Sequence, residues 1–183
     1  MNIHLNALII VLGITVCGAS AAQEANSKAE RDRIVALVRK CNPNDEYYNQ
    51  QNVDACTAAL AEPSLARPVR ALTLNVRGNT YDALGKHDLA IADYTEVARL
   101  LPDSAIGYGN LGLEYCRKGD FKKALRFFDE ALQRDPKYTF AMYGKGVALS
   151  HLGQTVAARE QLERANKADP GMADVYRQIK MPP

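Results

Sequence analysis

The sequence contains no tryptophan and only three histidines, and its positive and negative charges nearly cancel. Lys and Arg number 23 against 21 Asp and Glu, which gives a formal net charge of +2. Nucleic-acid-binding domains usually carry a basic patch or stripe, so we expect no nucleic-acid partner. The apolar run at residues 7–17 is 11 residues long, whereas a membrane-spanning helix needs about 20.

The usual motifs of metal sites and enzymes are also missing. No C-x2-C or H-x3-H spacing occurs, although zinc sites typically show one, and His87 is interpreted as a solvated turn residue. No serine stands in a G-x-S-x-G elbow. Cys116 could act as a nucleophile only with His151, and no third residue is placed to orient that pair. Residues 107–112 read G-x-G-x-x-G, but no strand precedes them. We therefore expect no enzyme, cofactor, metal or small-molecule substrate.

Residues 1–22 lack Asp, Glu, Lys and Arg. An apolar run followed by small residues is typical of a secretory signal peptide and predicts cleavage after Ala21 or Ala22. An uncleaved anchor is the alternative, because the first residues carry no Lys or Arg. The bulky Val16 before Cys17 disfavours a lipidated cysteine. We expect an exported protein, periplasmic or secreted, with no membrane insertion after cleavage.

The central stretch, residues 105–138, carries two apolar stripes on either side of a break at Gly119. The stripes have helical spacing and consist of Tyr108, Leu111 and Tyr115, then Ala124, Phe128 and Ala131. Gly112 lies within the first stripe, where it would let the second helix approach closely. Pro136 ends the second stripe, because proline disfavours a helical conformation in the residue before it. The stretch is therefore predicted to be a helical hairpin.

The same pattern recurs along the chain at a constant interval. Prolines lie at positions 68, 102, 136 and 170, and turn glycines lie at positions 85, 119 and 153 with the same spacing. The neighbouring copies are predicted at residues 71–104 and 139–172. Arg77 and Lys145 stand where the middle copy has Leu111, and these departures are expected to weaken the outer copies.

In these residues the chain resembles the tetratricopeptide repeat, a helical hairpin of about 34 residues with the signature W-x2-L-G-x2-Y…A-x3-F…P. Only Tyr108 departs from it in the middle copy, where tryptophan is usual. The resemblance implies an all-α fold, a right-handed superhelical solenoid with three repeat units across residues 68–172. Stacked hairpins bury their faces against one another, so the two ends need separate covers.

Residues 23–67 are predicted to form a degenerate helical hairpin that caps the array. Its second helix is expected to be capped within residues 52–54, and residues 173–183 are expected to form a short C-terminal capping helix and tail. Cys41 and Cys56 fall on the two helices of this cap, and exported bacterial tetratricopeptide proteins that look similar often carry such a pair. We predict a Cys41–Cys56 disulfide, with two buried thiols as the alternative and Cys116 unpaired.

The resemblance also implies a concave groove lined by the first helix of each unit. The candidate groove residues are Asn75, Asn79, Ile106, Asn110, Phe140, Tyr143 and His151. Cys116 also falls at a groove position, whereas Leu113 and Val147 are expected to pack between helices. One subset of the family binds chaperone C-termini through cationic side chains. This chain has Asn75, Phe140 and Gly144 at those places.

The sequence therefore predicts an exported, non-enzymatic module that binds a peptide or helical segment of another protein in its groove. The alternative is a structural or assembly subunit of a cell-envelope complex that uses its convex face or its ends. An exposed apolar patch on the cap would favour the alternative.

Overall fold

The computed structural model describes residues 28, 32–33, 35–41 and 48–174. The predicted signal peptide and most of the predicted C-terminal capping helix lie outside the described residues. No strand occurs in the described part, where residues 35–41 are helical and seven further helices follow. These are α2 (Gln50–Leu60), α3 (Arg67–Ala83), α4 (His87–Leu100), α5 (Ala105–Arg117), α6 (Phe121–Arg134), α7 (Thr139–His151) and α8 (Thr155–Ala168).

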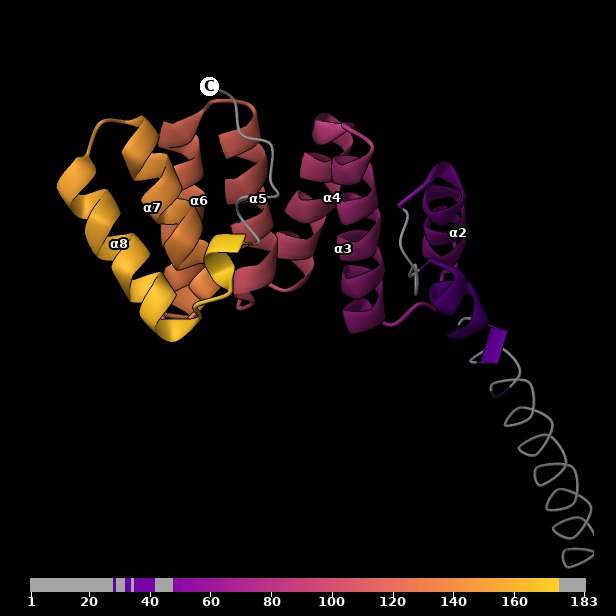
Figure 1. Cartoon of the computed structure of the whole chain (residues 1–183). Coiled ribbons are helices and arrows are strands. Elements are labelled where there is room, and N and C mark those ends of the chain that lie inside the picture. Colours follow the sequence, from indigo (N-terminus) through magenta and orange to yellow (C-terminus); the bar gives the residue numbers. More distant parts are fainter. Residues whose placement is uncertain (1–27, 29–31, 34, 42–47, 175–183) are drawn as a thin grey trace, which may run out of the picture.

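The helices pair into three hairpins, α3 with α4, α5 with α6 and α7 with α8, which follow one another in a row (Figure 1). Each hairpin packs on the next through α4 against α5 and α6 against α7. Helix α5 also contacts α7 directly. The predicted all-α solenoid is thus present, and α5 and α7 begin at the first residue of their predicted units. Helix α3 begins earlier, so that Pro68 lies in its first turn, where proline is tolerated.

The turns inside the hairpins are copies of one another. Gly85, Gly119 and Gly153 have φ angles of 71°, 74° and 74°, a left-handed conformation that glycine adopts without a steric penalty. The next residue bonds back across the turn each time: Lys86 N donates to the carbonyl of Tyr81, and Asp120 N to that of Tyr115. This is the hydrogen-bond pattern of a Schellman motif, which ends a helix and reverses the chain.

Close approach of the two helices in each hairpin depends on a second set of glycines. A Cβ on Gly112 would lie 2.7 Å from the ring of Phe128, and one on Gly78 would lie 2.6 Å from the ring of Tyr94. Phe128 is fully buried, so its ring occupies the space that glycine leaves. The predicted helix–helix contact at Gly112 is confirmed.

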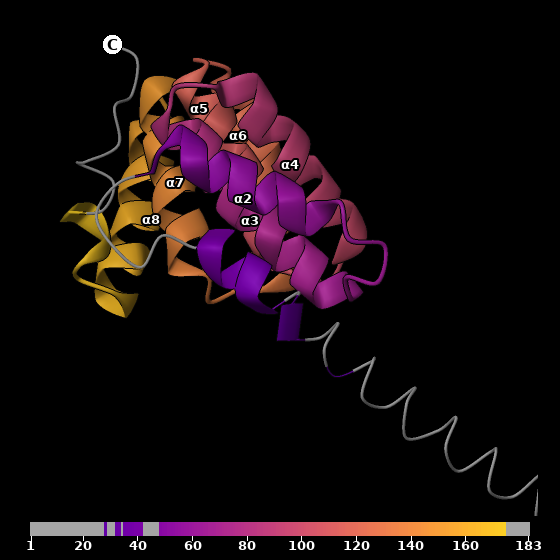
Figure 2. The same ribbon diagram turned by 90° about the vertical axis from the view of Figure 1, so that its right-hand side faces the viewer.

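The N-terminal cap is held by a disulfide. Cys41 and Cys56 are bonded, with their Cα atoms 4.4 Å apart, and Cys116 is a buried free thiol, so the predicted pairing is confirmed. Figure 2 shows α2 lying against the end of the array in front of α3. The prediction that residues 52–54 cap α2 is wrong. Asn49 is the N-cap, because its side chain accepts from the backbone of Asn52 while the Asn52 side chain accepts from that of Asn49.

Candidate functional site

The first helices of the three hairpins form one continuous layer, which carries the predicted groove residues. Asn110 Nδ2 donates to Asn75 Oδ1 over 2.7 Å, which joins α5 to α3. Arg117 Nη2 donates to Asp82 Oδ2 over 2.9 Å and joins the same two helices further along. With the direct contact between α5 and α7, these bonds place α3, α5 and α7 side by side.

Exposed apolar side chains mark one edge of this layer. Leu72 and Ile106 are 56% and 48% exposed, and they occupy the same place in successive units. Phe140, at the equivalent place in the third unit, is half-buried and lies 5.8 Å from the ring of Tyr138, measured between ring centroids. The layer therefore presents an apolar residue once per unit.

The polar candidates are already engaged within the protein. Asn79 Oδ1 accepts a hydrogen bond from the Tyr94 hydroxyl over 2.8 Å, and both Asn75 and Asn110 are half-buried. The ring of His151 stacks on Phe121, with centroids 4.2 Å apart. A partner bound here would use the remaining amide atoms and the exposed faces of these rings.

Of the positions that the family pattern assigns to the groove, Cys116 does not belong there. Its side chain is fully buried, and burial raises the pKa of its thiol to about 12, which does not suit a nucleophile at neutral pH. Leu113 is buried between helices, as expected, whereas Val147 is only half-buried. Tyr143 is half-buried as well.

An apolar recess lies at the N-terminal end of the array, where the cap meets α3. It has a volume of about 460 Å³ and is lined mainly by apolar side chains: Val35, Val38, Leu65, Ala66, Val69 and Leu72, with Arg39 and Ser64. Val35 is 48% exposed. Because Leu72 also lies on the predicted groove face, the recess continues that face onto the cap. Sequence reasoning did not locate this recess.

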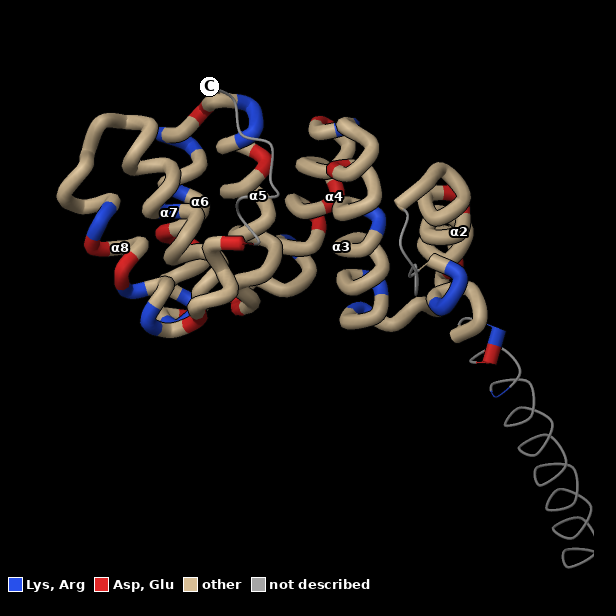
Figure 3. Tube along the Cα trace, in the orientation of Figure 1, with Lys and Arg blue, Asp and Glu red and all other residues tan. Residues whose placement is uncertain are grey.

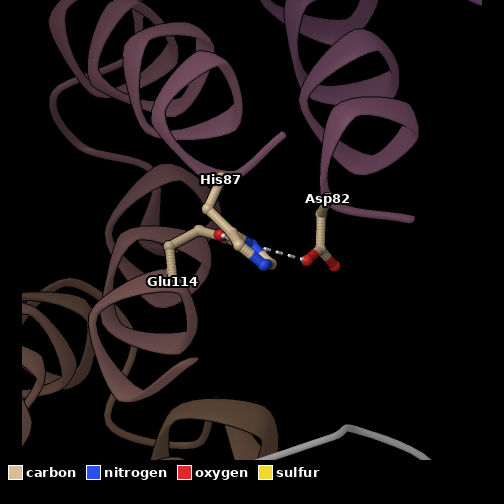
Figure 4. A group of neighbouring side chains, drawn as sticks. All are labelled: Asp82, His87 and Glu114. Carbon is tan, nitrogen blue, oxygen red and sulfur yellow. Dashed lines mark hydrogen bonds and ion pairs between the residues drawn. The ribbon is translucent and has the colours of Figure 1, made fainter. Parts of the chain in front are cut away.

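A second cluster, also missed, joins the first two hairpins. Figure 4 shows Asp82 of α3, His87 at the start of α4 and Glu114 of α5 converging from three helices. His87 Nδ1 lies 2.9 Å from Glu114 Oε2 and 3.6 Å from Asp82 Oδ1. The interpretation of His87 as a solvated turn residue is therefore wrong: its imidazole is directed at two carboxylates, and its side chain is 36% exposed.

Glu114 is the most unusual member of this cluster. Its side chain is fully buried, and burial, with the neighbouring charge of Asp82 as the next cause, raises the pKa of its carboxyl to about 8. Glu114 Oε1 and Asp82 Oδ1 are buried and have no hydrogen-bond partner within the described part of the chain. Buried carboxylate oxygens are normally paired, because leaving one unpaired costs free energy.

Comparison with known proteins identifies the repeat. Two models of the tetratricopeptide repeat match the chain, one at residues 75–139 and one at residues 116–179. The first tetratricopeptide domain of human RPAP3 is 29% identical with a TM-score of 0.55, and the match covers 61% of this chain and 91% of that one.

Two further solved structures are similar. The first tetratricopeptide domain of Spaghetti (RPAP3), bound to the HSP90 peptide SRMEEVD, is 26% identical with a TM-score of 0.55 and matches over 64% of this chain and 95% of its own. MamA is 17% identical with a TM-score of 0.64 over 85% and 82% of the two chains, and that likeness concerns the fold alone.

Proposed function

Because the chain belongs to the tetratricopeptide repeat family, we propose that it is a non-enzymatic module that holds a segment of a partner protein on the layer formed by α3, α5 and α7. The similar Spaghetti (RPAP3) domain is bound to an HSP90 peptide in its solved structure. The observation that carries the proposal is the apolar edge of the layer, where Leu72 and Ile106 are half exposed one unit apart.

The chemistry of the layer favours an apolar partner segment over an acidic one. The cationic places of the chaperone-binding subset hold Asn75, Phe140 and Gly144 in this chain. Arg117 is a cation of the same layer, but it is engaged by Asp82. A peptide rich in carboxylates would therefore find no unengaged cation at those three places, whereas apolar side chains would find Ile106 and the ring of Phe140.

Spacing adds a constraint on that segment. Packed helices lie about 8–10 Å apart, so the apolar residues contributed by successive first helices are separated by about that distance. An extended peptide rises about 3.3 Å per residue, and a helix about 1.5 Å. The proposed partner carries apolar residues about three apart if it is extended, or about six apart if it is helical.

We also propose that the protein works outside the cytoplasm. The predicted signal peptide at residues 1–22 is the sequence basis, and the Cys41–Cys56 disulfide supports it, since disulfides persist mainly in oxidising compartments. In the described residues no helix is long and apolar enough to cross a membrane. Lys and Arg are interspersed with Asp and Glu along the chain (Figure 3), which supports a protein partner over nucleic acid.

The test starts from affinity capture with the mature, oxidised protein. The captured partner is then titrated by calorimetry against wild type and Tyr143→Ala, since an aromatic anchor typically contributes ~2 kcal/mol, or about 30-fold in Kd. Val156→Ala is the matched control, because Val156 is 75% exposed on α8 and away from the layer of first helices. Equal binding by wild type and Tyr143→Ala would contradict a role for the groove.

The apolar recess on the cap favours a second candidate, an assembly subunit that binds through its N-terminal end. Val35→Asp would place a charge at that recess while leaving α5 and α7 unchanged. If Val35→Asp abolishes association and Tyr143→Ala does not, the cap is the working surface and the protein is an assembly subunit. If only Tyr143→Ala weakens binding, the groove is the working surface.

A further inference from the structure

We propose that Asp82, His87 and Glu114 form a binding site for a divalent transition-metal ion of the Zn²⁺ type, which links the first hairpin to the second. The sequence-based expectation was that the chain has no metal site, because no ligand motif is present. The three ligands come instead from α3, the start of α4 and α5 (Figure 4). The proposal does not depend on the partner-binding function.

The geometry suits a small ion with nitrogen and oxygen ligands. One ligand atom from each residue can be chosen so that all three lie within 4.8 Å of one another. His87 Nδ1 is 2.9 Å from Glu114 Oε2 and 3.6 Å from Asp82 Oδ1. In a tetrahedral zinc site with bonds of about 2.0–2.2 Å, ligand atoms are separated by about 3.3–3.6 Å. The separation of His87 Nδ1 from Asp82 Oδ1 reaches this range, and its separation from Glu114 Oε2 lies just below it.

One oxygen of each carboxylate has a partner: Glu114 Oε2 faces His87 Nδ1 over 2.9 Å, and Asp82 Oδ2 accepts from Arg117. The other oxygen of each does not: Glu114 is fully buried, and its Oε1 has no hydrogen-bond partner among the described residues; the same holds for Asp82 Oδ1. A buried carboxylate oxygen without a partner costs free energy, and a cation between the two would satisfy both. In the part of the chain that the structure describes, one unpaired oxygen on each of two neighbouring carboxylates, with an imidazole nitrogen directed at both residues, points to a cation.

Arg117 has the position of a residue that orients a ligand. It donates to Asp82 Oδ2 over 2.9 Å and leaves Oδ1, the oxygen nearer to His87, for the ion. Its Nε lies 3.8 Å from Glu114 Oε1, which is too far for a hydrogen bond. Carboxylates that ligate a metal are commonly held by a hydrogen bond from a neighbouring side chain, as Arg117 holds Asp82. The positive charge of Arg117 also lowers the affinity below that of an all-acidic site.

One ligand of the proposed site, His87, borders solvent. A recess of about 300 Å³ opens beside the imidazole and is lined by Gly85, Lys86, His87, Asp88, Leu89 and Lys118. The His87 side chain is 36% exposed and lines this recess, and its Nδ1 faces the two carboxylates. Three protein ligands leave a fourth position for water. The mixed ligand set favours Zn²⁺ over Mg²⁺, which prefers oxygen ligands in octahedral geometry.

The experiment uses the full chain with its disulfide intact, freed of metal by a chelator and titrated with Zn²⁺ by calorimetry. We expect one ion per chain, no measurable heat with Mg²⁺, and a visible absorption band of tetrahedral type when Co²⁺ replaces Zn²⁺. His87→Ala and Glu114→Gln are each expected to lower the Zn²⁺ affinity at least tenfold. His151→Ala is the matched control, because His151 stacks on Phe121 away from the cluster.

Folding of each variant is checked by circular dichroism without metal. If Glu114→Gln proves unstable, His87→Ala still tests the proposal. The His87 side chain is partly exposed, so its removal leaves no cavity in the hydrophobic core. Thermal unfolding gives a second readout: Zn²⁺ should raise the Tm of wild type and of His151→Ala but not that of His87→Ala. Failure of wild type to bind Zn²⁺, or equal binding by His87→Ala, would overturn the proposal.

Discussion

The middle hairpin and the two outer hairpins have different kinds of side chain at one equivalent position of the repeat. At the seventh place of each unit the middle hairpin has Leu111, which is buried at 3% exposure in a cluster with Tyr94 and the half-buried Phe127. The first hairpin has Arg77 there, and its guanidinium donates to both oxygens of Asp93 over 2.7 and 2.8 Å. Asp93 stands one repeat before Phe127, so an ion pair replaces an apolar pair in the same two places.

The third hairpin uses another partner. Lys145 Nζ donates over 2.6 Å to Asp129 Oδ1, which belongs to α6 of the preceding hairpin. The seventh position of a unit therefore accommodates a cationic side chain when the second helix of the same hairpin or of the preceding one supplies an acidic residue. Arg77 and Lys145 were expected to weaken the outer units; that expectation stays a prediction, and the structure adds that the two pairs differ in burial. The Arg77 and Asp93 side chains are 19% and 7% exposed, those of Lys145 and Asp129 26% and 49%.

The largest effect should come from breaking the buried pair of the first hairpin. Asp93→Ala leaves the Arg77 guanidinium without its main partner and is expected to lower the free energy of unfolding by ~3 kcal/mol, as measured by urea denaturation. Glu96→Ala is the control on the same helix, since the Glu96–Arg99 pair is exposed, and it should leave the unfolding midpoint unchanged.

A double variant can replace the ion pair of the first hairpin by the apolar residues that the middle hairpin has at the same two positions. Arg77→Leu combined with Asp93→Phe should recover most of the stability lost in Asp93→Ala, because the same two places hold Leu111 and Phe127 in the middle hairpin and a buried ion pair can often be replaced by well-packed apolar residues without loss. A double variant no more stable than Asp93→Ala would show that the two hairpins differ in backbone arrangement as well as in side chains.

A smaller effect is expected at the glycines of close approach. Gly112→Ala places a Cβ 2.7 Å from the fully buried Phe128 ring and should cost ~2 kcal/mol of unfolding free energy through overpacking. Gly146→Ala meets the half-buried Leu162 at the same distance and the Ala158 carbonyl oxygen at 3.3 Å. Because Leu162 is less buried than Phe128, the cost should be smaller, ~1 kcal/mol. Equal losses in chemical denaturation would show that Leu162 makes room for the new Cβ no more readily than Phe128 does.

The smallest effect should come from the exposed pair. Lys145→Ala removes a contact to the half-exposed Asp129, and pairs of this kind contribute ~0.5 kcal/mol or less. Denaturation at low and high salt should give nearly the same midpoint as wild type. A loss as large as that of Asp93→Ala would mean that the third hairpin depends on Lys145 in a way that its exposure does not indicate.

The repeat was predictable because its signals are local and periodic. Glycines that must adopt positive φ, prolines between units and apolar stripes at helical spacing recur once in every unit, and each follows from short-range sterics. The Cys41–Cys56 bond was predictable for the same reason, since both cysteines fall on the two helices of one predicted hairpin.

The contacts between neighbouring first helices were not predicted, because they depend on how whole units lie against each other. Asn75 and Asn110 are 35 residues apart, as are Asp82 and Arg117. Nothing in either local sequence marks them as partners. Stacking of the units brings side chains about one period apart into contact, however, so aligning the units and looking for complementary residues at that separation would have found both pairs.

The three turn glycines, with φ angles within 3° of one another, have a consequence for how the length of the array can change. The turn within each of the three hairpins has the same backbone conformation at its glycine, and the links between hairpins recur at the same place in each period. Removing residues 105–138 as a block would join Ser104 to Thr139, so a unit end would again meet a unit start. Deletions or insertions of whole periods therefore preserve the register of every remaining turn, whereas a change of another length within a helix rotates the residues that follow it out of their interfaces.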